Sequence, residues 1–103
     1  MVKEVKFLNF NREVSQNEKK VVILFGASWC LACREIMPLF ERWSLEYPTY
    51  DFKYVDLSVS KRFIKRFNIS ATPTFILFEN KNIIKSFVGI QTDETFEYFL
   101  LNK

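Results

Sequence analysis

The sequence predicts an α/β fold, a three-layer sandwich in which helices flank a mixed central β-sheet. Three observations predict it. The run Lys20–Ala27 (KVVILFGA) is apolar after its first residue, which is typical of a parallel strand buried on both faces. Helically spaced apolar residues follow this run. Two strand-like segments, 74–79 and 83–88, flank the turn 80–82 as an antiparallel hairpin would.

The first part of the chain is expected to supply two strands and a short helix. Val2–Leu8 alternates apolar and polar residues well enough for a strand, and a short polar helix is expected near Asn11–Lys19. The buried strand Lys20–Ala27 follows. These two strands would lie in the central sheet.

A long helix is expected to begin at the two cysteines, Cys30 and Cys33. Apolar residues recur after them at helical spacing, namely Ile36, Leu39, Phe40, Trp43 and Tyr47. Pro48 ends this helix because the residue before a proline resists helical backbone angles. The cysteines would therefore lie where a buried strand passes into a helix.

The remaining elements alternate between strand and helix. Tyr50–Leu57 is the next expected strand, Ser60–Phe67 the next helix, and Thr74–Glu79 with Ile83–Val88 the hairpin. Thr92 would cap a final helix. Its core-facing residues would be Phe96, Phe99 and Leu100. Right-handed crossovers would place the ends of the parallel strands, and so the cysteines, at one edge of the sheet.

Length and composition define the size and setting of the molecule. The 103 residues form one expected domain, 1–103, and the 49% apolar content indicates a packed core that folds without a disulfide. No apolar run approaches the roughly 20 residues of a membrane span, and the start MVKEVKFLNFNREV has no signal-peptide core. We therefore expect a cytoplasmic monomer that binds no membrane.

The net charge of +3 is too small to predict nucleic-acid binding. One cationic cluster would form a single helix face opposite Phe63, Ile64 and Phe67. Its members are Lys61, Arg62, Lys65 and Arg66. A solvated helix face is the simpler interpretation of this cluster, and a docking patch for an acidic partner protein is the alternative.

The cysteine pair could be a reagent, part of a metal site or an inert pair of core thiols. In a reducing compartment a close pair is more often catalytic or metal-binding than structural. Tetrahedral zinc prefers about four sulfur or nitrogen ligands, and the chain has two cysteines and no histidine, so no metal site is expected. The lack of histidine also excludes Cys-His nucleophilic chemistry.

Position assigns different roles to the two thiols. Backbone N–H groups at the helix start would lower the pKa of Cys30, and Cys33 would lie deeper, within disulfide reach. We expect an exposed Cys30 to attack a substrate disulfide and a sheltered Cys33 to release the product from the mixed disulfide. No cofactor is expected beyond this redox-active pair.

The motifs FGASWCLAC and ATPT, with Pro38 five residues after the second cysteine, resemble the thioredoxin family over essentially the whole chain. The resemblance implies a thioredoxin-like fold and a thiol–disulfide oxidoreductase that reduces protein disulfides. It implies recharging by a thioredoxin reductase or another dithiol reductant, and a cis bond before Pro73. The substrate-binding residues that it implies are Trp29, Leu31, Ala32, Thr72, Pro73 and Gly89.

The chain departs from the family pattern at three places. Leu31-Ala32 replaces the familiar Gly-Pro between the cysteines, Leu24 replaces a buried aspartate, and Phe52 replaces a neighbouring lysine. Resolution by Cys33 would thus lose its nearest proton acceptor. The alternative functions are a specialised oxidase or isomerase, a glutathione-coupled variant, and a non-enzymatic binding module with a thioredoxin fold.

Overall fold

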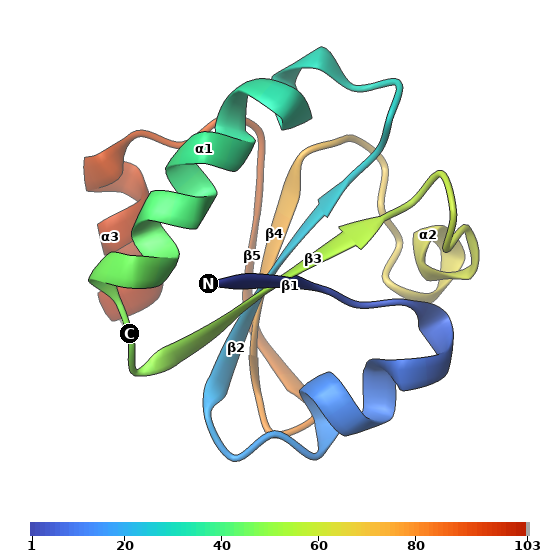
Figure 1. Cartoon of the computed structure of the whole chain (residues 1–103), viewed down its shortest axis with the longest axis horizontal. Helices are drawn as coiled ribbons and strands as arrows, with labels where there is room; N and C mark the ends of the chain where they lie inside the picture. Colours follow the sequence, from blue (N-terminus) through green and yellow to red (C-terminus); the bar gives the residue numbers. More distant parts are fainter. Residues whose placement is uncertain (103) are drawn as a thin grey trace.

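The computed structural model describes residues 1–102, in which one mixed sheet has helices on both faces (Figure 1). Its strands, in the spatial order β1-β3-β2-β4-β5, are β1 (Val2–Glu4), β3 (Tyr50–Asp56), β2 (Lys20–Gly26), β4 (Thr74–Glu79) and β5 (Asn82–Val88). β1, β3 and β2 run parallel, whereas β4 is antiparallel to β2 and β5. This confirms the predicted α/β architecture. The expected domain, 1–103, includes Lys103, which lies outside the described residues.

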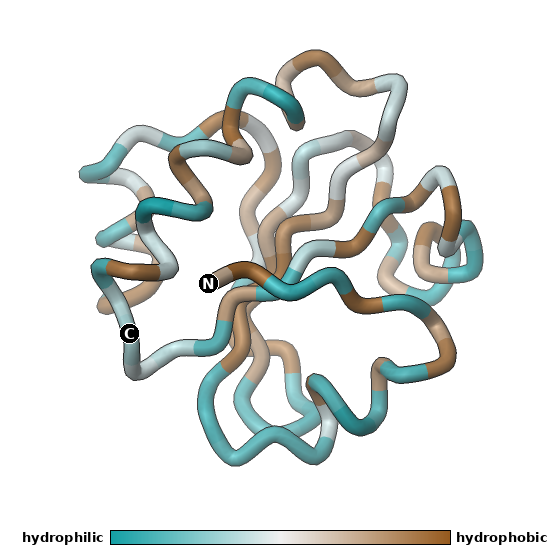
Figure 2. The backbone as a smooth tube through the Cα atoms, in the orientation of Figure 1, coloured by the Kyte–Doolittle hydropathy of each residue, from teal (hydrophilic) through white to brown (hydrophobic). Residues whose placement is uncertain are grey.

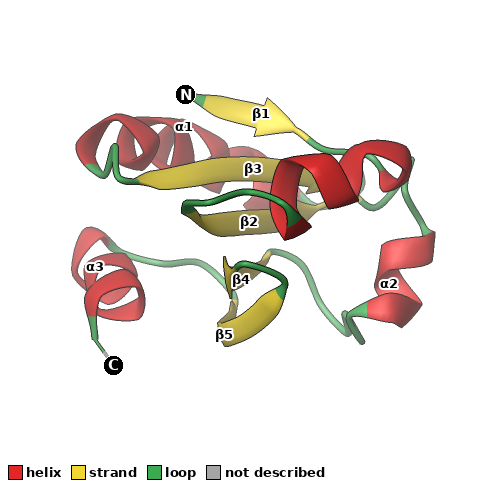
Figure 3. Ribbon diagram, turned by 90° about the horizontal axis from the view of Figure 1, so that it is seen from below, coloured by secondary structure: helices red, strands yellow, loops and turns green. Residues whose placement is uncertain are grey.

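The helices form the two outer layers of the sandwich. They are α1 (Leu31–Glu46), α2 (Arg62–Arg66) and α3 (Asp93–Leu101), with the short helical turns η1 (Phe7–Asn9) and η2 (Asn11–Ser15). Seen along the sheet, α1 and α3 lie on one face, and α2 with the N-terminal turns lies on the other (Figure 3). In the described part of the chain, no helix is long and apolar enough to cross a membrane.

Strand β2 shows why the sheet is covered on both faces. Val21, Ile23 and Phe25 pack into the core cluster on the α2 side, whereas Val22 and Leu24 pack into the cluster on the α1 side. The alternation follows from the two-residue period of a strand. Figure 2 shows the apolar stretches in the strands and the hydrophilic stretch in the loop before β2.

Helices α1 and α3 are joined by aromatic contacts and by side-chain hydrogen bonds to Asp93, to which Arg42 Nη2 also donates at 2.7 Å. The rings of Trp43 and Phe96 are stacked with centroids 4.1 Å apart, and the Trp43 indole Nε1 donates to Asp93 Oδ1 at 2.8 Å. Thr92 caps α3 as predicted, because its Oγ1 accepts from the Thr95 N–H at 3.1 Å. The start of α3 is thereby fixed against α1.

The N-terminal elements are shorter than the sequence predicts. The strand ends at Glu4, not Leu8, because the Lys6 N–H donates to Asn9 Oδ1 at 2.8 Å and the chain turns there. The helix ends at Ser15, not Lys19. The Asn17 amide donates to the Glu13 carbonyl and to Asp51 Oδ2. Side-chain hydrogen bonds thus end both elements.

Other bounds also differ from those predicted. β2 ends at Gly26, not Ala27, β3 at Asp56, not Leu57, and α2 at Arg66, not Phe67. Helix α2 begins at Arg62, not Ser60, because residues 57–59 form a turn that the Ser60 N–H closes by donating to the Asp56 carbonyl at 2.9 Å. The β4–β5 turn has two central residues, Asn80 and Lys81, and Asn82 already belongs to β5. Asn80 has a φ of 59°, which asparagine tolerates better than most residues.

Candidate active site

The cysteines lie just after the carboxyl end of β2, where α1 begins. Cys30 and Cys33 form a disulfide, with Cα atoms 5.3 Å apart. Cys30 is the N-cap of α1, and its Sγ accepts a hydrogen bond from the Cys33 N–H at 3.2 Å. A backbone N–H aimed at this sulfur, together with the positive end of a helix, favours the thiolate of Cys30 once the disulfide is reduced.

The two sulfurs differ in accessibility in the expected order. Cys30 is 8% exposed and Cys33 is 2% exposed. The prediction of an exposed Cys30 is nevertheless wrong for this oxidised state, because both cysteines pack into the same apolar cluster as Ala27 and Phe25. Between them, Leu31 is 67% exposed and Ala32 packs partly against that cluster. A partner therefore meets Leu31 and the edge of Cys30 first.

The turn before Cys30 is held by polar contacts that the sequence pattern does not reveal. The Ser28 N–H donates to Ser58 Oγ at 2.8 Å, and the two hydroxyl oxygens are 2.9 Å apart. Arg34 Nη2 donates to the Ser28 carbonyl at 2.8 Å. These contacts link the start of α1 to the loop after β3 and so fix the backbone that carries Trp29 and Cys30.

The residues expected to bind substrate come from three loops, which follow β2, precede β4 and follow β5. Trp29 is 63% exposed, and it lines a hollow of about 200 Å³ together with Thr72. The Thr72–Pro73 bond is cis, as predicted, and Pro73 is buried. The Gly89 N–H donates to the Pro73 carbonyl at 2.8 Å, which places the two side by side. The structure thus brings Trp29 close to Thr72, and Gly89 close to Pro73.

Gly26 lies against Tyr54 and Cys33, and the sequence motifs do not predict that these two residues are close to it. A Cβ on Gly26 would lie 3.1 Å from the Tyr54 phenol oxygen and 3.2 Å from Cys33 Sγ. Burial raises the pKa of Tyr54, and the charges of Asp56 and Glu4 raise it further. The phenol beside Cys33 is therefore protonated at neutral pH. Only the β2–β3 register, which pairs Leu24 with Tyr54, reveals this neighbourhood.

The place of the family's buried acid is wholly apolar. Leu24 and Phe52 are buried in one cluster with Phe40, and the rings of Phe40 and Phe52 have centroids 5.1 Å apart. The buried lysine of β3 is Lys53, on the opposite face, where its Nζ lies 3.3 Å from Glu13 Oε1. Among the described residues, no aspartate or glutamate is buried.

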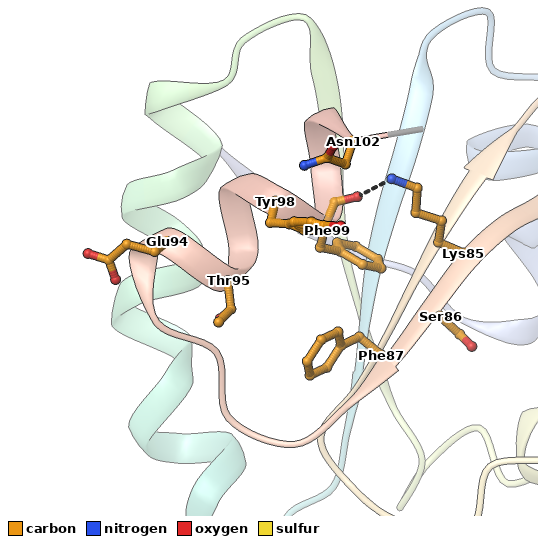
Figure 4. A pocket seen from close by; sticks show the side chains of 8 residues that line it. All are labelled: Lys85, Ser86, Phe87, Glu94, Thr95, Tyr98, Phe99 and Asn102. Atoms are coloured by element: carbon orange, nitrogen blue, oxygen red, sulfur yellow. Dashed lines mark hydrogen bonds between the residues drawn. The ribbon is translucent and has the colours of Figure 1, made fainter.

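A separate hollow lies between β5 and α3, as Figure 4 shows. It measures about 620 Å³, and the rings of Phe87 and Phe99 approach within 6.3 Å in its lining. Lys85 Nζ donates to the Phe99 carbonyl at 2.9 Å, so this ammonium is already engaged. Neither cysteine lines the hollow, so the candidate redox site remains at the start of α1.

Known proteins resemble this chain over most of its length. Thioredoxin H5 of Oryza sativa subsp. japonica is 37% identical over 91 residues, which cover 88% of this chain and 67% of the rice protein. Thioredoxin-1 of Saccharomyces cerevisiae is 35% identical over 80 residues, with coverages of 78% and 77%. A peptide-N(4)-(N-acetyl-beta-glucosaminyl)asparagine amidase of Caenorhabditis elegans is 42% identical over 74 residues, which cover 72% of this chain but 12% of the amidase.

The family comparison covers nearly the whole sequence. Residues 1–102 match the Thioredoxin family model. This range includes every strand and helix of the sandwich, both cysteines and the Thr72–Pro73 bond. The chain therefore belongs to the thioredoxin family.

Proposed function

We propose that this chain reduces disulfide bonds of protein substrates by thiol–disulfide exchange. Family membership and the Cys30–Cys33 pair support a thiol–disulfide oxidoreductase. The strongest support is a hydrogen bond between the two cysteines. The Cys33 N–H donates to Cys30 Sγ at the start of α1, which favours a thiolate on the more accessible of the two sulfurs.

The first step forms the mixed disulfide. The Cys30 thiolate attacks one sulfur of the substrate disulfide, and a Cys30–substrate bond forms as the substrate S–S bond breaks. The second substrate sulfur leaves as a thiolate and takes up a proton from solvent. The N–H that donates to Cys30 Sγ stabilises the attacking anion before the step.

The second step closes the intramolecular disulfide. Cys33 loses its proton and attacks Cys30 Sγ, which releases the remaining substrate sulfur as a thiolate. The Cα separation of 5.3 Å already suits a disulfide, so the backbone need not move for this closure. The substrate gains two electrons, and the Cys30–Cys33 pair loses two.

The proposed substrate surface consists of Trp29, Thr72, Pro73 and Gly89, with Leu31 and Ala32 at the start of α1. The hollow beside Trp29 and Thr72 accommodates a side chain next to the target disulfide. The loop backbone of Thr72 can pair with an extended segment. Gly89 carries no side chain, and no atom lies within 4 Å of where its Cβ would be, which permits close approach of a partner backbone.

A dithiol reductant must return two electrons to Cys30–Cys33 after each turnover, and a thioredoxin reductase is the proposed donor. No further cofactor is needed, because the cysteine pair itself carries both electrons. The proposed setting is a reducing compartment such as the cytoplasm.

Reduction of insulin by dithiothreitol, followed as turbidity, tests the proposal. We expect the wild-type protein to accelerate the reaction, and both Cys30→Ser and Cys33→Ser to abolish the acceleration. A wild-type protein that is folded but inactive would overturn the proposal in favour of a binding module. Faster reactivation of scrambled ribonuclease, without insulin reduction, would instead indicate an isomerase.

A further inference from the structure

A groove on the α2 side of the molecule is lined by cations and exposed aliphatic side chains. It measures about 440 Å³, and Lys6, Lys61 and Arg62 contribute to its lining with Leu8 and Val59. Leu8 is 97% exposed and Val59 is 63% exposed. We call this set of residues the cationic groove. It combines positive charge with aliphatic surface that is open to solvent.

The cations of the cationic groove have no acidic partners. Within residues 1–102, neither Lys6 nor any of the four cations of segment 61–66 forms an ion pair. No carboxylate lines the groove either. Neighbouring like charges without counter-charges create a positive potential that an anionic partner would relieve.

Aromatic rings hold in place the guanidinium group of Arg62, in the groove, and that of Arg66, further along α2. Arg62 Cζ lies 4.9 Å from the centroid of the Phe7 ring, and Arg66 Cζ lies 4.7 Å from that of Phe10. A stacked guanidinium keeps its N–H groups free at the edge, where they suit carboxylates. Because these side chains are already ordered, a ligand loses less conformational entropy in pairing with them.

The two helices on the opposite side of the sheet carry six of the twelve acidic residues and a net negative charge. Helices α1 and α3 together contain two arginines, Arg34 and Arg42, and six acids. The acids are Glu35, Glu41, Glu46, Asp93, Glu94 and Glu97. The charge is thus separated across the sheet, which orients an approaching acidic partner toward the α2 side.

The cationic groove adjoins the redox site through one loop. Val59 and Ser60 line the groove, and Ser58 in the same loop binds the turn before Trp29 through the Ser28 N–H. Leu57 lines the hollow beside Trp29 and Thr72. A polypeptide bound across that hollow can therefore continue over Val59 to Lys61 and Arg62.

We propose that the cationic groove docks an acidic segment with an aliphatic side chain, carried by the proteins whose disulfides this chain reduces. The substrate part of this inference rests on the proposed function. Exposed Leu8 and Val59 fit an aliphatic anchor, whereas the Phe7 ring that could stack on a nucleic-acid base is covered by Arg62. Charge and surface chemistry together favour an acidic polypeptide over a nucleic acid.

Binding of cysteine-free peptides tests docking independently of disulfide reduction. The probe is a fluorescein-labelled peptide with a run of glutamates around one leucine, compared by anisotropy with the same peptide carrying glutamines. At low salt we expect the glutamate peptide to bind at least about tenfold tighter, and Lys61→Glu/Arg62→Glu to remove this preference. Lys61→Gln/Arg62→Gln, a milder change, should remove most of it.

The matched control is Lys20→Glu/Lys81→Glu, which changes the net charge equally at the far end of β2 and β4. It should weaken peptide binding no more than about twofold. The proposal would be overturned if the control weakened peptide binding as much as Lys61→Glu/Arg62→Glu does, or if the wild-type protein showed no preference for the glutamate peptide. It would also be overturned if a single-stranded oligonucleotide bound more tightly than the peptide and this binding depended on the groove.

Kinetics with disulfide substrates test the link to catalysis. An acidic tail beside the disulfide should lower KM for the wild-type protein but not for Lys61→Glu/Arg62→Glu, while reduction of hydroxyethyl disulfide stays equal in both. If the acidic tail does not change the KM of the wild-type protein, the proposal that its substrates carry the acidic segment is overturned. Inactivity of the wild-type protein on every disulfide would overturn the proposed function, and peptide binding would still report on the docking surface.

Discussion

The phenol of Tyr54 and the sulfur of Cys33 lie against the same face of Gly26. A Cβ at this glycine would meet Tyr54 Cε1 at 3.0 Å and Cys33 Sγ at 3.2 Å. Both distances are shorter than ordinary van der Waals contact. Because Gly26 has no side chain, both the Tyr54 ring and the Cys33 sulfur can pack against this position of β2.

Gly26→Ala should destabilise the protein by about 1 to 3 kcal/mol, because the added methyl group overpacks this contact. Chemical denaturation of the reduced proteins measures the change. Tyr54→Leu removes the ring, so the cost of Gly26→Ala should fall in that background. An equal cost with and without the Tyr54 ring would contradict this assignment.

Gly89→Ala should also destabilise the protein, for a different reason. Its φ of 102° is unfavourable for residues with a side chain, although no atom lies within 4 Å of a Cβ there. We expect a loss of about 1 to 2 kcal/mol in chemical denaturation. A variant as stable as the wild type would show that the loop relaxes to a negative φ.

Leu24→Asp should move activity and stability in opposite directions. The carboxyl would enter an apolar cluster with Phe40 and Phe52, so its pKa should rise and the fold should lose several kcal/mol. Residue 24 shares a strand face with Gly26, whose Cβ position lies 3.2 Å from Cys33 Sγ. An ionised carboxyl on this face should speed release of the mixed disulfide by accepting the thiol proton. Stopped-flow kinetics and denaturation measure the two effects.

Leu24→Asn is the control for Leu24→Asp, because asparagine has nearly the same shape as aspartate but does not titrate. It should lose stability without gaining release rate. If Leu24→Asp releases the mixed disulfide no faster than wild type near pH 7 and near pH 8.5, proton acceptance from Cys33 does not limit the reaction.

Glu13 should make the fold sensitive to acid. The hydrogen bond from Lys3, aided by those from Arg12 and Lys53, lowers the pKa of Glu13 from 4.5 to about 2 against the opposing effect of burial. The unfolded carboxyl takes up its proton first as pH falls. The stabilisation is therefore complete above about pH 4.5 and lost toward pH 2.

Thermal denaturation of wild type and Glu13→Gln across this pH range measures the effect. We expect Glu13→Gln to be less stable by about 1 to 2 kcal/mol at neutral pH, since solvent screens the exposed Lys3 and Arg12. The difference should shrink as pH falls. A difference that is constant from pH 7 to pH 2 would assign the loss to packing.

The sequence predicted the elements that have a strong hydrophobic pattern and misplaced the ends that single side-chain hydrogen bonds decide. The apolar run of β2 and the helical spacing of α1 were sufficient to place both. The end of β1 depends on one Asn9 hydrogen bond, which propensity does not encode. Terminal residues of short elements are decided by such single contacts.

The candidate site divides in the same way. Cys30, Cys33 and Pro73 were predictable because motifs mark them. The Ser28–Ser58 contact joins residues from the loops after β2 and β3, and the Tyr54–Gly26 neighbourhood depends on the register of those strands. Register and loop conformation are not readable from spacing along one chain.

Cys30 is proposed to attack the substrate and Cys33 to release the product, and competitive alkylation tests these two roles most directly. The fully reduced protein is treated with a single equivalent of iodoacetamide near pH 7, and mass spectrometry maps the modified residue. We predict that Cys30 is modified first, because the Cys33 N–H stabilises its thiolate and it is the more accessible sulfur. Preferential modification of Cys33 would contradict the assignment and reverse the two roles.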